Sequence, residues 1–442
     1  MKETVVAIST PPGRGGIGIV RMSGKDSLKI VNKVFKGKDL IPRYMTYGHI
    51  LDEQNIADEV MVCYYQAPKS YTKEDMVEIF CHGGYVSCVM VLDILLKNGA
   101  VLAEGGEFTK RAFFNGRINL LEAEAIKGII DSESKTEQQL YQRIYSGKLS
   151  EKIDYLMDEM ISLVAECEAK IDYPELGDVE DFKERINGIS ERIDSLISDA
   201  NRSKLYQEGI KTAILGRPNV GKSSLLNMLT NKERAIVTEI PGTTRDTIEE
   251  RIFYKDISLN LVDTAGIRNT DELVEKIGID ISKKTAEISD LIILMIDASE
   301  ELSEDDLLLL SSYNDKKKIV FLNKLDKTQK VSEENIKKYG VDVIAGSVKN
   351  DIGIRELLEK IYDMLKTNLD SEFVSLFNIR QINLLEEAKE ELAKAKSDMD
   401  YMPFEVVEVS LRVALDKVLE IIGRVGDDEI IDRVFKDFCV GK

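Results

Sequence analysis

The chain has 442 residues, of which 43% are hydrophobic and 31% charged, and its formal net charge is -19. This length predicts about three folding units, because domains average roughly 150 residues, and the composition is that of a globular protein rather than a disordered one. The acidic balance argues against nucleic-acid binding that depends mainly on long-range attraction to phosphates, and no apolar run approaches the roughly 18 residues of a membrane span.

The first predicted domain spans residues 1–118 and contains short strands separated by glycine and proline. The strand-like runs include residues 4–8, 17–22, 60–65 and 76–80. Such runs with glycine and proline between them predict a small α/β or α+β domain. No apolar leader follows Met1, which predicts a cytoplasmic protein.

Three glycines in this domain match the spacing of a dinucleotide-binding loop: Gly13, Gly15 and Gly18. In such a loop a helix should begin after the glycines, and an acidic residue should end a second strand about 20 residues later. Here a second strand is predicted at residues 17–22, and that acidic residue is missing. We therefore interpret the glycines as a tight turn that lines a different pocket.

Helical spacing of apolar residues dominates residues 119–208 and returns in residues 369–442. Between them, residues 209–368 alternate strand-like and helix-like segments, which is typical of a doubly wound α/β domain. Because the two ends of a domain often lie close together, we predict that this α/β domain is inserted into one helical domain. Two separate helical bundles are the alternative.

A phosphate-binding motif opens the α/β domain. Residues 216–223 read Gly-Arg-Pro-Asn-Val-Gly-Lys-Ser and lie between a predicted strand and a predicted helix. In this motif glycines allow backbone N–H groups to surround phosphates at a helix N-terminus. Lys222 is expected to reach the β- and γ-phosphates, and the Ser223 hydroxyl is expected to bind Mg²⁺.

Two further motifs follow predicted strands in the expected order. Residues 263–266 read Asp-Thr-Ala-Gly, which suits a carboxylate that supports Mg²⁺ and a glycine near the γ-phosphate. Residues 323–326 read Asn-Lys-Leu-Asp, and a carboxylate at Asp326 can accept hydrogen bonds from N1–H and the 2-amino group of guanine. Adenine lacks this pair of donors, so the site is predicted to select GTP. Residues 347–349 read Ser-Val-Lys where such domains usually have Ser-Ala-Lys.

The group that positions the attacking water is less evident. Ras-like proteins place a glutamine directly after the Asp-x-x-Gly motif, and this chain has Ile267 there. Thr244, in the segment 242–246, is the expected second hydroxyl on Mg²⁺. The carboxylates beyond Gly266 are Asp271, Glu272 and Glu275, and spacing alone does not choose among them.

These motifs resemble the G domain of the MnmE (TrmE) family of bacterial tRNA-modification GTPases. Other segments are also similar to that family: Ile-Pro-Gly-Thr-Thr-Arg-Asp at 240–246, the glycine-rich stretch 10–18, the segment 106–113, and Phe-Cys-Val-Gly-Lys at 438–442. The resemblance covers roughly the whole chain. A regulatory ribosome-assembly GTPase of the Era type is the rival interpretation, but such a protein usually carries a basic RNA-binding module.

The resemblance implies a homodimeric GTPase that works with the FAD-containing MnmG protein in a heterotetramer or larger complex. Its reaction would modify C5 of the wobble uridine of certain tRNAs, with the one-carbon unit supplied by a reduced folate such as 5-formyltetrahydrofolate. The implied ions are Mg²⁺ and K⁺.

The resemblance also implies particular site residues. The catalytic residues would be Glu275 as general base, Lys222 and Thr244. GTP contacts are expected at Asn219, Val220, Gly221, Lys222, Ser223, Ser224, Thr238, Thr243, Thr244, Asp263, Thr264, Ala265, Gly266, Asn323, Lys324, Asp326, Ser347 and Lys349. The expected metal ligands are Ser223 and Thr244 for Mg²⁺, and Asn219, Thr238, Ile240 and Thr243 for K⁺. The folate pocket would use Arg21, Glu78, Arg117 and Lys442.

Two features depart from the family or have no evident role. Lys73 replaces a glycine that the family commonly has. Cys439 lies four residues from the end, but the final Lys442 and the lack of an upstream basic cluster make a prenylation signal improbable; a small buried thiol and a functional thiol both remain open. The five cysteines form no CxxC pair, so neither a zinc site nor a disulfide framework is expected.

Overall fold

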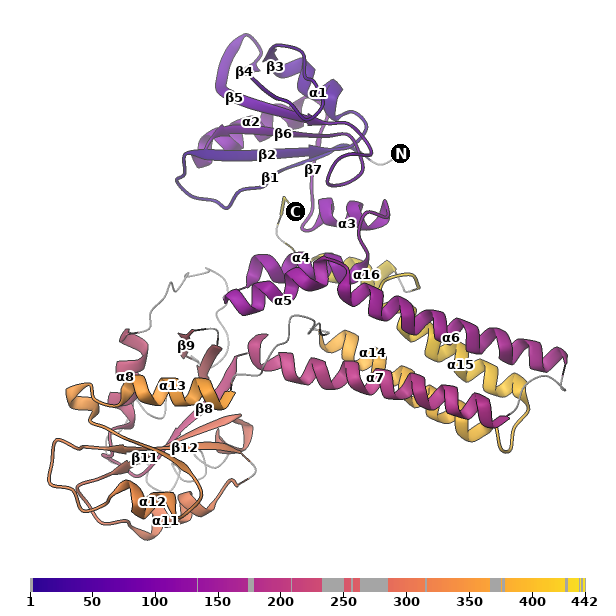
Figure 1. Cartoon of the computed structure of the whole chain (residues 1–442). Coiled ribbons are helices and arrows are strands. Elements are labelled where there is room, and N and C mark those ends of the chain that lie inside the picture. Colours follow the sequence, from indigo (N-terminus) through magenta and orange to yellow (C-terminus); the bar gives the residue numbers. More distant parts are fainter. Residues whose placement is uncertain are drawn as a thin grey trace. The chain divides into compact units, whose positions relative to one another are not determined.

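The computed structural model describes residues 3–132, 134–173, 179–207, 209–232, 250–255, 257–262, 285–314, 316–365, 375, 378–425, 428–436, 438 and 440–441. The chain forms two compact units. One contains Met1–Asp131, Tyr141–Ser195 and Asn378–Lys442, and the other contains Ser132–Leu140 and Leu196–Phe377. Most of the helical segment before the α/β region therefore belongs to the same unit as the helical segment after it (Figure 1). This confirms the predicted fold class, in which the α/β domain is inserted into a helical one.

The N-terminal domain is built on a seven-stranded sheet in the order β3-β4-β5-β6-β2-β1-β7. Neighbouring strands are antiparallel except β1 and β7, which are parallel. The strands are β1 (Val5–Ile8), β2 (Ile17–Ser23), β3 (Phe35–Gly37), β4 (Met45–Asp52), β5 (Asn55–Tyr65), β6 (Met76–His82) and β7 (Val101–Leu102). The glycine-rich turn thus leads into strand β2, and no helix begins there.

Two helices, α1 (Ser27–Val34) and α2 (Tyr85–Lys97), pack against the sheet and form the core of this domain. Side chains alternate between the faces of a strand. On β6, Val77 and Ile79 lie in the core, so Glu78 between them belongs to the opposite face. The chain then continues into α3 (Glu107–Phe114).

Long amphipathic helices form the helical part. They are α4 (Leu120–Asp131), α5 (Lys135–Tyr145), α6 (Lys148–Asp172), α7 (Val179–Gln207), α14 (Ile379–Asp398), α15 (Phe404–Ile421) and α16 (Asp428–Lys436). On α6 the buried residues recur every three or four positions, as in Leu149, Ile153, Leu156 and Met160. α15 packs against both α6 and α14, so segments from both sides of the inserted domain share one core (Figure 1).

The inserted domain has a six-stranded sheet in the order β13-β12-β11-β8-β10-β9, parallel except for the edge strand β9. Its strands are β8 (Ile210–Leu215), β9 (Glu250–Tyr254), β10 (Ile257–Leu261), β11 (Leu291–Asp297), β12 (Lys317–Asn323) and β13 (Asp342–Ala345). Its helices are α8 (Lys222–Lys232), α11 (Glu304–Ser311), α12 (Glu333–Lys337), the 3₁₀ turn η1 (Val348–Asn350) and α13 (Ile354–Leu365). Separate apolar clusters cover its two faces, which explains why every residue of β11 is buried.

The described cysteines Cys63, Cys81, Cys88 and Cys167 are buried free thiols. Within the described ranges, no helix has both the length and the apolar character that crossing a bilayer requires.

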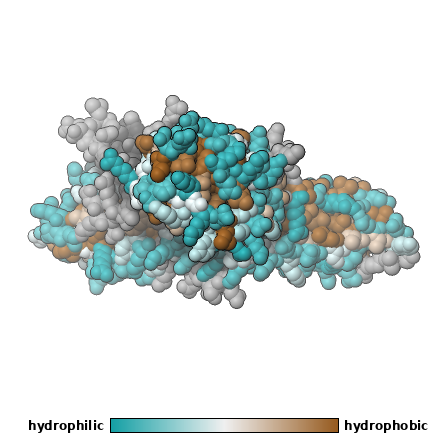
Figure 2. Space-filling model, turned by 90° about the horizontal axis from the view of Figure 1, so that it is seen from above, coloured by the Kyte–Doolittle hydropathy of each residue, from teal (hydrophilic) through white to brown (hydrophobic). Residues whose placement is uncertain are grey.

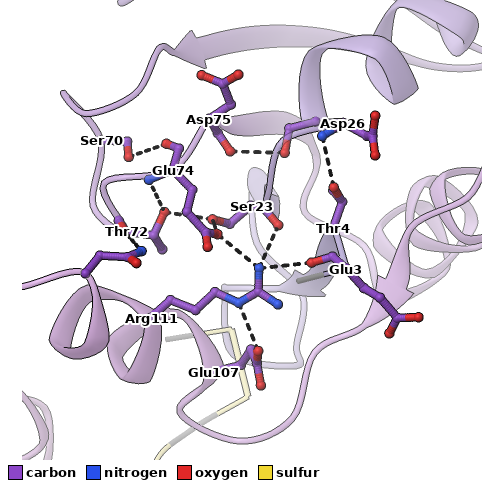
Figure 3. A network of polar contacts seen from close by, with 12 residues as sticks. Glu3, Thr4, Ser23, Asp26, Ser70, Thr72, Glu74, Asp75, Glu107 and Arg111 are labelled. Carbon is purple, nitrogen blue, oxygen red and sulfur yellow. Dashed lines mark hydrogen bonds and ion pairs between the residues drawn. The ribbon is translucent and has the colours of Figure 1, made fainter. Parts of the chain in front are cut away.

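A buried polar network fixes the loop between β5 and β6 (Figure 3). Arg111 of α3 donates from Nη1 to Glu74 Oε2 at 3.0 Å, and the Ser23 hydroxyl donates to the same carboxylate oxygen at 2.9 Å. Thr72 is fully buried, and its hydroxyl lies 2.7 Å from that of Ser23. The backbone is therefore fixed on both sides of Lys73.

Lys73 occupies the left-handed region, with φ of 58°. The left-handed conformation raises the free energy of an L-residue by about 1–2 kcal/mol but not that of glycine, which explains why glycine suits this position. Its amino group donates to Gly116 O at 2.7 Å, but this bond is exposed.

We expect Lys73→Gly to be more stable than Lys73→Ala by about 1 kcal/mol, because both lose the amino group and only alanine keeps the backbone strain. Urea unfolding of the two variants, measured under identical conditions, checks this difference. An alanine variant as stable as the glycine variant would show that residue 73 is not strained.

Candidate functional site

The order of the strands places one candidate site at the carboxyl end of β8. From β8 the chain continues to β9 and β10 on one side of the sheet, and then to β11, β12 and β13 on the other. Ligands of doubly wound folds bind in the crevice where the strand order reverses in this way. Residues 216–223 follow β8 directly, and α8 begins at Lys222.

The loop 216–221 lies so close to the neighbouring strands that two positions require glycine. Gly216 has φ of +142°, and a Cβ there would lie 2.4 Å from Met295 O. Gly221 has φ of +108°, and its Cβ would lie 2.5 Å from Asn323 Nδ2. Asn219, with φ of 63°, is exposed on the same loop.

The amino group of Lys222 lies over this loop. Its Nζ donates to Gly216 O at 2.7 Å and to Arg217 O at 2.8 Å. Burial lowers the pKa of Lys222. Two of the three N–H groups are thus directed at loop carbonyls, and this arrangement places the cation where phosphate groups would contact the loop.

Asn323 connects two loops of the site. Its Nδ2 donates to Val220 O at 2.8 Å, and its Oδ1 accepts from Val348 N at 2.9 Å. The residue is 3% exposed. Sequence reasoning predicted Asn323 as a GTP contact, but its visible role is to hold the loop 216–221 against the segment 347–349.

Asp326 and Ser347, which are both predicted GTP contacts, lie together in the structure. Ser347 Oγ donates to Asp326 Oδ1 at 2.6 Å, and this bond lowers the pKa of the exposed Asp326 carboxyl. Val348 is 3% exposed and belongs to the apolar core. The valine therefore packs inward, into the core of the inserted domain.

Sequence reasoning missed Asp297, the last residue of β11. Its Oδ2 lies 2.6 Å from Lys324 Nζ, and its Oδ1 accepts from Ser299 N at 2.9 Å and from Ser299 Oγ at 2.7 Å. Burial alone would favour the neutral acid, but these contacts from Lys324 and Ser299 lower the pKa of Asp297. The available signal was an aspartate that ends an otherwise apolar strand.

Several predicted site residues lie outside the described residues. They are Thr238, Ile240, Thr243, Thr244, Asp263, Thr264, Ala265, Gly266, Glu275 and Lys442. Cys439 and the carboxylates Asp271 and Glu272 lie outside them too. Their predicted roles therefore stay predictions.

A second polar cluster lies in the N-terminal domain. Arg21 of β2 and Glu78 of β6 are partners in the sheet register, and Arg21 donates to Glu78 Oε1 from Nε at 2.9 Å and from Nη2 at 2.8 Å. Tyr65 Oη donates to the other oxygen, Oε2, at 3.0 Å. Arg21 Nη1 also donates to Gly441 O at 3.1 Å, which brings the C-terminal segment to the cluster.

Arg117 joins this cluster through Tyr71. Its guanidinium lies 4.6 Å from the centre of the Tyr71 ring, and the Arg21 guanidinium lies 5.5 Å from the same ring. Arg117 Nη1 also donates to Tyr71 O at 3.1 Å. The structure thus brings together the three described residues of the predicted folate pocket.

Comparison with known proteins gives matches along the whole chain. A family model described as the GTP-binding protein TrmE N-terminus matches residues 4–117, and one described as the MnmE helical domain matches residues 120–439. The tRNA modification GTPase MnmE of Lactobacillus helveticus is 43% identical over 454 residues, covering 100% of this chain and 98% of that protein. The protein of the same name from Clostridioides difficile is 43% identical over 456 residues, with 100% and 99% covered.

Among solved structures, the G domain of the FeoB iron transporter of T. maritima is 32% identical and covers 35% of this chain and 98% of that chain, with a TM-score of 0.26.

Proposed function

Because the chain belongs to the MnmE family of tRNA modification GTPases, we propose that it couples GTP hydrolysis to modification of C5 of the wobble uridine of certain tRNAs, as carboxymethylaminomethyl or aminomethyl addition. The reaction would require an FAD-containing MnmG partner. The observation that carries this proposal is the full-length match, which includes the N-terminal and helical domains as well as the GTP-binding domain. An Era-type GTPase would share only the last of these.

Nucleoside analysis of tRNA from cells that lack this gene tests the proposal. We expect the wobble uridine modification to disappear and to return when the wild-type gene is supplied. A Lys222→Ala gene provides the matched control, because it should leave the fold intact and remove the phosphate contact. Unchanged wobble uridines in the deletion strain would refute the assignment.

The residues near the phosphate loop suit the proposed Mg²⁺ and K⁺ ions. Ser223, on the first turn of α8, offers a hydroxyl, and Asn219 offers an amide oxygen on the exposed part of the loop. Oxygen ligands of this kind are the ones that hard cations prefer. When bound, the ions would supply positive charge against the phosphates.

The cluster around Arg21 suits a reduced folate such as 5-formyltetrahydrofolate. A carboxylate such as Glu78 can accept hydrogen bonds from the amino-pyrimidine edge of a pterin, and the guanidinium groups of Arg21 and Arg117 suit the carboxylates of a glutamate tail. Arg21 Nη1 donates to Gly441 O, so the C-terminal segment contacts the cluster at Gly441. A purely structural ion pair between Arg21 and Glu78 is the alternative.

We expect Arg21→Ala and Glu78→Ala to weaken 5-formyltetrahydrofolate binding by about 10- to 100-fold, the usual worth of a hydrogen bond to a charged group. GTP turnover should stay unchanged, because the two sites belong to different units. Calorimetry of both variants measures the effect, and Lys36→Ala, an exposed cation on β3, serves as control. Equal affinity in wild type and both variants would favour the structural ion pair.

Exposed apolar side chains on the N-terminal domain support the proposed homodimer. Figure 2 shows apolar surface among the hydrophilic residues, and the large exposed side chains of this part include Ile41, Tyr44, Met45, Tyr47 and Ile56. Exposed apolar side chains that gather in a patch are typical of association sites. A tRNA substrate and an MnmG partner would make the proposed activity cytoplasmic. Sedimentation analysis that finds only monomers would contradict the homodimer.

A further inference from the structure

The side chain of Arg217, the second residue of the phosphate loop, contacts the start of α11. Its Nε lies 2.8 Å from Asp306 Oδ2, and its Nη2 lies 3.2 Å from Glu300 Oε2. The Glu300 side chain is 59% exposed, whereas that of Asp306 is fully buried. Because solvent screens the exposed contact, Asp306 is the partner that matters.

Asp306 carries a second function at the N-terminus of α11. Its Oδ2 accepts from Ser303 N at 3.0 Å and from Ser303 Oγ at 2.9 Å, which closes a capping box. Its Oδ1 is buried and has no hydrogen-bond partner among the described residues. A buried carboxylate needs a compensating charge, and Arg217 supplies it.

The far end of α11 is also fixed. Lys318, near the start of β12, donates from Nζ to Leu310 O and to Ser312 O, both at 2.6 Å. A cation at the last carbonyls of a helix stabilises it. α11 is therefore attached at one end to the central sheet and at the other end to the phosphate loop.

The backbone of Arg217 contacts Lys222 rather than α11. Its carbonyl oxygen accepts from Lys222 Nζ at 2.8 Å, next to the bond from Lys222 to Gly216 O at 2.7 Å. One residue thus contacts α11 through its side chain and the phosphate-loop lysine through its carbonyl. A displacement of Arg217 would displace the group that holds Lys222.

We propose that Arg217 is a positioning residue whose ion pair with Asp306 fixes the phosphate loop on α11, so that Lys222 is already in place before a nucleotide binds. Such preorganisation lowers the cost of ordering the loop on binding, and breaking it weakens nucleotide affinity. The coupling is reciprocal, so a bound nucleotide stabilises the start of α11. The proposal rests on the assignment of residues 216–223 to the GTP site.

The test uses the full-length protein with Arg217→Met, Asp306→Asn and the double variant. Asparagine at position 306 keeps an acceptor for Ser303 but removes the charge. Dissociation of a fluorescent GDP is followed by stopped flow, and kcat and KM are measured with GTP. We expect each single variant to release GDP about 5- to 20-fold faster and to raise KM, with kcat changed much less.

The double variant decides whether Arg217 acts through Asp306. If it does, the double variant releases GDP no faster than the faster single variant, because one interaction is removed in all three. If the effects of the two substitutions on the GDP release rate add up in the double variant, the proposal would be overturned and direct contact of Arg217 with the nucleotide would be indicated. Glu300→Gln is the control, and it should release GDP like wild type.

A reciprocal measurement separates this role from simple stabilisation of the helix. Hydrogen exchange at the amides of α11 should slow when GDP is added to wild type, and this effect should be lost in Asp306→Asn. The proposal would be overturned if Arg217→Met released GDP at the wild-type rate. It would also be overturned if GDP did not change the hydrogen-exchange rate of the α11 amides in wild type. Failure of wild type to bind guanine nucleotides would instead refute the site assignment itself.

Discussion

Asp326→Asn should lower GTP affinity by about 10⁴-fold and raise the affinity for XTP. A site that hydrogen-bonds a polar edge rejects a mismatched edge by factors of this order. The bond from Ser347 Oγ to Asp326 Oδ1, at 2.6 Å, orients the carboxylate and lowers the pKa of Asp326, so it is an acceptor at neutral pH. The asparagine amide would instead present a donor, which suits the C2 carbonyl of xanthine.

The change in nucleotide preference is measured by titrating wild type and Asp326→Asn with GTP and with XTP, and by following hydrolysis of each nucleotide. Asp342→Asn is the matched control, because this exposed carboxylate on β13 pairs with Lys360 and lies outside the motifs. Unaltered GTP affinity in Asp326→Asn would show that Asp326 does not read the base.

GTP turnover should be faster in potassium than in sodium, and Asn219→Ala should remove the advantage of potassium. Phosphoryl transfer concentrates negative charge that the proposed contacts from Lys222 and Mg²⁺ would only partly neutralise. Loss of one preorganised contact to that charge typically costs roughly 2.7–4 kcal/mol, a hundred- to a thousandfold in rate. We expect Asn219→Ala to lower the rate of GTP hydrolysis in potassium by that factor or less, with nucleotide binding largely kept. Potassium should also promote association of two G domains with a transition-state analogue.

The backbone at position 219 supplies the control. Because Asn219 has φ of 63°, alanine there would add strain, whereas glycine would remove the side chain without strain. Both variants should lose the potassium response if the amide oxygen is responsible. If wild type hydrolyses GTP equally fast in the two salts, or if GTP turnover is lost only in Arg245→Ala or Arg268→Ala, an arginine finger would be favoured over potassium.

The sequence predicted those parts of the fold in which composition and periodicity agree. The alternation of strands and helices in residues 209–368 gave the doubly wound sheet, because parallel strands buried on both faces read as continuous apolar runs. β4 was missed, since two of its three buried positions are Thr46 and Gly48, which hide the alternation. β9 was missed as well; among the described strands it lies at the edge of the sheet and pairs with β10.

The candidate site was predictable as motifs but not as contacts. The spacing of 216–223 and of 323–326 identifies both segments, yet nothing local indicates that Asn323 bonds to Val220, 103 residues earlier. The pairing of Asp297 with Lys324 likewise depends on β11 and β12 being neighbours in the sheet. Long-range contacts of this kind follow from topology, which a linear pattern does not contain.

The shared core of α6 and α15 also limits when the helical part can fold during synthesis on the ribosome. Cys167 of α6 donates to Phe404 O, 237 residues later in the chain. At about 5–20 residues per second, synthesis of that interval takes roughly 10–50 s. During this time the part of α6 that packs against α15 lacks that partner, although α4 and α7 are already synthesised. Nascent chains that end before residue 404 should therefore be the ones that chaperones recognise.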